Sequence, residues 1–148
     1  MELKQALVES FVETLAMFGK SAIFQSEMEI EHLESASQVN VLIGLTMGAH
    51  GNVVLGLDET VALKLASAMM GGAEVAEIDS IVQSALGELL NMVLGSALQK
   101  IGPSNLIDIS PPTLVTGSRI TLMISRVRSY KLLFTMDDET YHISFSVE

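Results

Sequence analysis

The fold is decided by the stretch DSIVQSALGELLNMVLGSALQKI, which covers residues 79 to 101. Apolar side chains recur in it every three or four residues, which predicts one long helix with a single buried face. We expect this helix to begin near Asp79, to run to about Ile101, and to be closed by Gly102 and Pro103. The expected buried stripe consists of Val82, Leu86, Leu89, Val93 and Ala97.

Two further helices are expected on the N-terminal side of this stretch. Apolar residues four apart predict a helix from about residue 2 to residue 18, with Gly19 as its stop signal. Asp58 is a good N-cap for a second helix that runs from Glu59 to about Met70, where Gly71 and Gly72 end it. The long helix is therefore the third of three.

Apolar and β-branched runs predict strands between the first and second helices and again after the long helix. Between the first two helices we expect a strand over residues 24–33 and a hairpin over residues 39–46 and 52–57, and after the long helix strands over residues 120–127, 130–136 and 141–147. In the last strand Tyr141 alternates with His142, so its two faces differ in polarity. Helices packed on a largely antiparallel sheet make an α+β fold, which we expect to form one domain over residues 1–148.

Composition excludes several classes of function. The chain has no cysteine, which rules out disulfides and thiolate chemistry. Its net charge of −10 disfavours a nucleic-acid partner. No uninterrupted apolar run reaches the roughly 18 residues of a membrane span, and the N-terminus lacks the pattern of a secretory signal, so we expect a cytoplasmic protein with no membrane partner. The 49% of hydrophobic residues suggests that a partner or a second copy covers part of the surface.

The long helix also has a polar face. At about 100° per residue, Ser84, Glu88, Asn91 and Gly95 fall on one side, and Gly87 lies about 60° away. A solvated face is the ordinary interpretation of a Glu and an Asn three residues apart. Interior glycines each cost about 1 kcal/mol relative to alanine, and one reason to keep them is the close approach of another surface. That surface could belong to a partner or to the first helix of the same chain.

The segment Ser84 to Gly95 resembles the signature helix of the CheC/CheX/FliY family of chemotaxis phosphatases. That signature has a Ser or Asp, three residues, a Glu, two residues, an Asn, and a proline a little over twenty residues later. Here Pro112 follows Asn91 with 20 residues between them. One such helix is visible, as in CheX members, whereas CheC and FliY members carry two. The resemblance implies a CheC-like fold and a homodimer.

The resemblance also implies a reaction and a partner. The substrate would be a phosphorylated CheY-like receiver domain, which brings its own Mg²⁺, so that the chain needs no cofactor or metal of its own. A neutral amide is a poor general base, but it can hold an attacking water in line with phosphorus. Asn91 would position that water, Glu88 would pair with the receiver's active-site lysine, and partner contacts would come from Ser84, Gly87, Gly95 and Pro112.

Other functions find less support in the sequence. His32, His50 and His142 are far apart and lack the spacing of metal ligands, and no glycine-rich segment ends in the Lys-Ser/Thr of a phosphate loop. Two alternatives stay open beside the phosphatase. One is a non-catalytic module of the same fold that binds a receiver or a flagellar-switch component, and the other is a scaffold with no receiver partner.

Overall fold

The computed structural model describes residues 1–102 and 106–147, and it contains three helices and nine strands within them. The helices are α1 (Leu3–Met17), α2 (Glu59–Met69) and α3 (Ser80–Ile101). The strands are β1 (Ile23–Ile30), β2 (Leu33–Ser35), β3 (Val39–Met47), β4 (Gly51–Leu57), β5 (Asp108–Ile109), β6 (Thr113–Thr116), β7 (Leu122–Ser125), β8 (Ser129–Met136) and β9 (Glu139–Val147).

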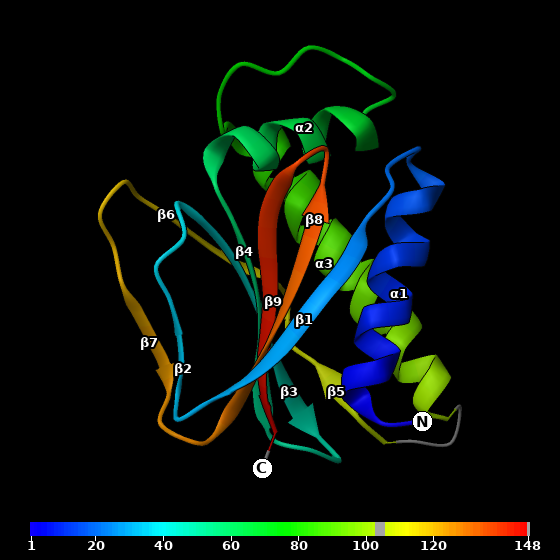
Figure 1. The fold of residues 1–148 in the computed structure, drawn as a ribbon, viewed down its shortest axis with the longest axis vertical. Coiled ribbons are helices and arrows are strands. Elements are labelled where there is room, and N and C mark those ends of the chain that lie inside the picture. Colours follow the sequence, from blue (N-terminus) through cyan, green and yellow to red (C-terminus); the bar gives the residue numbers. More distant parts are fainter. Residues whose placement is uncertain (103–105, 148) are drawn as a thin grey trace.

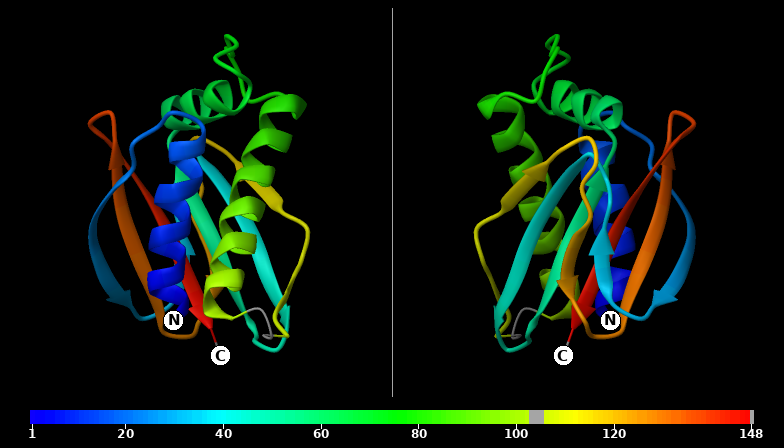
Figure 2. Two further views of the ribbon diagram at one scale, coloured as in Figure 1. Left: turned by 90° about the vertical axis from the view of Figure 1, so that its right-hand side faces the viewer. Right: turned by 90° about the vertical axis from the view of Figure 1, so that its left-hand side faces the viewer.

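The main sheet has the strand order β1-β8-β9-β4-β3-β5, and β6 also pairs with β3. All of its pairings are antiparallel, so the expected α+β class is confirmed. Helices α1 and α3 lie side by side on one face of this sheet, and α2 crosses one end of it (Figure 1). The side view places α1 toward the β1 end and α3 toward β5 and β6 (Figure 2).

The core lies between these helices and the sheet. The stripe expected on α3 is buried there, from Val82 to Ala97. An aromatic group fills the space under α1, where the Phe11 ring centroid lies 4.8 Å from that of Phe134 and 5.4 Å from that of Tyr141. Burial and the negative charge of Asp137 raise the pKa of the Tyr141 hydroxyl, which keeps it neutral.

A second, smaller layer covers the other face of the main sheet. Strands β2 and β7 pair with each other there, and β2 contacts β9 (Figure 1). The polar side of β9 is therefore buried, and His142 is one of the strand residues that this layer encloses. Its ring nitrogens lie 3.1 Å from the hydroxyls of Ser37 and Ser144. A Cβ on Gly56 would collide with this ring, so glycine leaves the space that His142 fills.

Other expectations need smaller corrections. The strand expected over residues 24–33 is two strands, because the chain turns at Glu31 and His32 into the second layer. Strands β5 and β6 were not predicted at all. Pro103, expected to close α3, lies outside the described residues. Within residues 1–102 and 106–147, α3 is the one helix that is long and apolar enough to span a membrane. Nine of its residues are buried against the rest of the protein, as in the core helix of a globular domain.

Candidate functional site

The polar face of α3 points away from the core, as its periodicity predicts. Ser84, Glu88 and Gly95 are exposed, and Asn91 is half-buried. Asp79 is the N-cap of the helix, as expected, and its carboxylate accepts a hydrogen bond of 2.9 Å from the backbone N–H of Val82. The sheet and α1 support the opposite side of α3, so a surface that docks here meets a helix with a fixed backbone.

Glu88 and Asn91 both keep their polar groups free. Among the described residues, neither side chain takes part in a hydrogen bond or ion pair with the rest of the chain. Lys100 is the cation of the same helix, and it pairs with Glu13 of α1 at 3.0 Å. A carboxylate and an amide without internal partners are available to bind groups on another molecule.

The two glycines of α3 have different surroundings. A Cβ on Gly87 would lie 3.0 Å from Cγ of Pro112, which is tighter than almost all real contacts. The surface that comes close to Gly87 is therefore the chain's own β5–β6 connection, and not the first helix. A Cβ on Gly95 would meet nothing within 4 Å, so the space above Gly95 is open.

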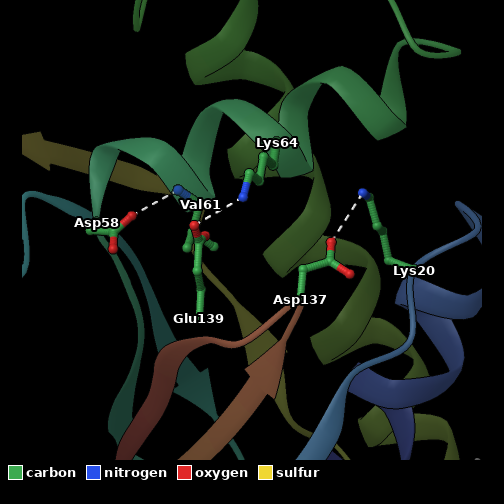
Figure 3. A network of polar contacts seen from close by, with 6 residues as sticks. All are labelled: Lys20, Asp58, Val61, Lys64, Asp137 and Glu139. Atoms are coloured by element: carbon green, nitrogen blue, oxygen red, sulfur yellow. Dashed lines mark hydrogen bonds and ion pairs between the residues drawn. The ribbon is translucent and has the colours of Figure 1, made fainter.

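A wide hollow of the described surface lies away from the α3 face. A groove of about 1230 Å³ runs along α2 and the end of α1, and none of the predicted site residues lines it. Lys64 and Lys20 stand beside it and tie α2 and the α1–β1 loop to the β8–β9 turn (Figure 3). The Lys64 Nζ lies 2.9 Å from Glu139, whose hydrogen bond raises the pKa of that lysine, and Lys20 pairs with Asp137 at 3.5 Å. These pairs link structural elements, and each of the two lysines has a carboxylate partner.

No cluster in the described part of the chain resembles a metal centre: three or more His, Asp or Glu side chains are nowhere grouped so as to hold an ion. The α3 face offers one carboxylate, one amide, one hydroxyl and an open glycine. Such a set can bind a cation and orient a water.

Comparison with known proteins bears on this face. The family model described as "Chemotaxis phosphatase CheX" matches residues 39–135, which include α3 and Pro112. The chain belongs to the CheX family. A CheX relative from Thermotoga maritima, the CheY-P phosphatase CheX, is 30% identical over 145 residues, which is 97% of this chain and 94% of the relative.

Solved CheX structures share the fold. The chemotaxis protein CheX of Desulfovibrio desulfuricans has a TM-score of 0.86 at 19% identity, with 100% of both chains covered. The CheX–CheY–BeF3–Mg²⁺ complex from Borrelia burgdorferi contains a chain with a TM-score of 0.76 at 17% identity, covering 100% of this chain and 99% of that one. At these identities the likeness establishes the CheC-like fold, and the family match establishes a chemotaxis phosphatase family.

Proposed function

We propose that this chain accelerates hydrolysis of the phospho-aspartate of a CheY-like receiver domain, in chemotaxis or another two-component pathway of the cytoplasm. The observation that carries the proposal is the free carboxylate and amide three residues apart on the exposed side of α3. Support also comes from the relative named as a CheY-P phosphatase and from the neighbour that was solved together with CheY.

Asn91 would act on the attacking water. Its carbonyl oxygen accepts one hydrogen bond from the water, and its NH₂ group can donate to a phosphoryl oxygen. The water oxygen then forms a bond to phosphorus while the bond from phosphorus to the aspartate oxygen breaks, which yields inorganic phosphate and a free carboxylate. The amide would hold the water in place and would not accept its proton. A glutamine side chain orients the attacking water of GTPases in the same way.

Glu88 would hold the receiver in place. An exposed carboxylate without an internal partner pairs readily with a lysine of a docking surface, and the exposed Gly95 leaves room for that surface. Ser84 and Pro112 complete the contact area on either side. The receiver would bring the Mg²⁺ that neutralises its phosphoryl group, as the composition of the Borrelia complex suggests, so this chain supplies no cofactor.

The test is the decay of a radiolabelled phosphorylated receiver in the presence of Mg²⁺. Asn91→Ala should lower kcat on the order of 10²-fold, because the water loses its positioning group while alanine suits a helix. Gln99→Ala removes an amide from an exposed position of the same helix and should leave the rate unchanged. Receiver binding without any acceleration by the wild type would instead favour the non-catalytic module.

We also propose that the chain forms a homodimer through β1. This strand is one edge of the main sheet, and it exposes apolar side chains at Ile23 (59%), Phe24 (38%) and Met28 (47%). Its two acidic side chains are already neutralised, because Glu27 pairs with Lys4 at 2.7 Å and Glu29 with Arg128 at 3.2 Å. An eight-residue edge strand with exposed apolar side chains and paired charges suits antiparallel pairing with a second copy.

Sedimentation of two methionine variants tests this interface. Met28→Glu places a charge on the edge strand and should convert the dimer to a monomer at tens of micromolar. Met47→Glu places the same charge at a methionine of β3 that is 60% exposed, and it should leave the dimer intact. A wild-type chain that sediments as a monomer under these conditions would exclude the dimer.

A further inference from the structure

The strand that borders β3 is interrupted beside the active face of α3. Ile109 of β5 pairs with Leu45, and Thr113 of β6 pairs with Leu42 of the same strand. Between them run Ser110, Pro111 and Pro112, which form no regular ladder with β3. Proline has no N–H to donate, so two successive prolines force the chain away from the sheet edge at this point.

Both ends of this three-residue segment are fixed. Ser110 is tied to Gly44 of β3 twice, since its N–H donates to the Gly44 carbonyl at 2.8 Å and its hydroxyl oxygen accepts from the Gly44 N–H at 2.8 Å. At the other end Pro112 packs on the α-carbon of Gly87, close enough that an added Cβ would lie 3.0 Å from its Cγ and 3.4 Å from its Cβ. The segment therefore spans the distance between the sheet edge and α3 as a short brace.

We propose that Pro112 is a positioning residue, which acts through Gly87 to set the placement of Glu88 and Asn91; the inference rests on the proposed phosphatase function. Gly87 directly precedes Glu88 and lies about one turn before Asn91. Because neither of these side chains has an internal hydrogen bond among the described residues, their placement depends on the backbone of α3. Pro112 contacts that backbone at Gly87, which is buried and directly precedes Glu88.

If Pro112 has this role, Gly87→Ala alone should be harmful, and adding Pro112→Ala to it should restore part of the loss. Gly87→Ala should lower kcat about tenfold, because the new methyl group forces α3 and Pro112 apart, and a shift of a fraction of an ångström disturbs an aligned water. Pro112→Ala should cost less, since it loosens the brace without pushing the helix. In the double variant the Cγ that collides with the methyl group is gone, so most of the kcat lost in Gly87→Ala should return, whereas the loss of a receiver contact at Pro112 should affect KM.

The assay is the decay of the phosphorylated receiver with kcat and KM measured separately, on variants whose folding is checked by circular dichroism. Ala97→Gly lies on the buried side of the same helix and is the stability control, which should melt lower than wild type but keep its kcat. An active wild type with an equally active Gly87→Ala, or a double variant no better than Gly87→Ala, would overturn the positioning role alone. An inactive wild type would overturn the proposed function, and this role with it.

Discussion

Glu88 and Asn91 are neighbours on one helix, yet the proposed chemistry gives them different kinetic signatures. Glu88→Ala should raise KM about tenfold with a smaller change in kcat, because it removes a charge pair of the complex and not the water-positioning group. Raising the ionic strength should weaken wild-type binding in the same direction. Glu88→Gln keeps the shape without the charge, so it should behave as alanine does; a Glu88→Gln variant with wild-type KM would argue against the ion pair.

His142 predicts how stability depends on pH. Burial, and to a lesser extent the charge of Lys131, lowers the pKa of this histidine from 6.5 to about 4. The unfolded chain thus binds a proton below pH 6.5 that the folded chain refuses until about pH 4. The free energy of unfolding should fall across this window, by about 3 kcal/mol at its lower end, and be fully recovered above it.

Urea unfolding of His142→Asn between pH 7 and pH 4 measures this contribution. Asparagine still hydrogen-bonds to the serines around it but does not titrate, so its stability should fall less steeply than that of the wild type. His50→Asn removes an exposed imidazole and controls for the loss of a histidine as such. Parallel profiles for His142→Asn and wild type would show that the buried ring does not resist protonation.

At the scale of an element, the stability of the first turn of α3 depends on its N-cap residue, Asp79. Asp79→Ala should lower the free energy of unfolding by about 1 kcal/mol, because the first turn of the helix loses an acceptor for the Val82 N–H. Asp79→Asn keeps that acceptor and should cost much less. Urea denaturation measures both, with an unchanged denaturant slope as the sign that only stability has moved. Equal losses in the two variants would assign the effect to charge rather than to capping.

Elements with a strong period were predictable from the sequence. All three helices lie within two residues of the predicted bounds, and the hairpin of β3 and β4 has the predicted turn. Strands β5 and β6 have two and four residues and flank a proline pair, so no alternation marks them, and they exist only because β3 offers its edge. The break after Ile30 also depends on a distant partner, since β2 is held by β7.

The same division holds for the candidate site. The helical period alone placed Ser84, Glu88 and Asn91 on one outward face. It could not say which surface approaches Gly87, because that surface comes from a segment more than twenty residues later whose course is set by pairing with β3. The burial of His142 was hidden for a similar reason: the layer that covers it is built from β2 and β7, which are far from β9 in the chain.

At the scale of the whole molecule, the β1 edge and the α3 face lie at opposite ends of the sheet (Figure 2). A dimer joined at β1 therefore leaves each reactive face complete within one copy and open to its own receiver. A gene that encodes a chain with a defective α3 face should therefore be recessive to the wild-type gene. Cells that make Asn91→Ala and wild-type chains together should contain mixed dimers with about half the activity per dimer, because independent sites contribute additively. Mixed dimers with no activity would mean that the two faces depend on each other.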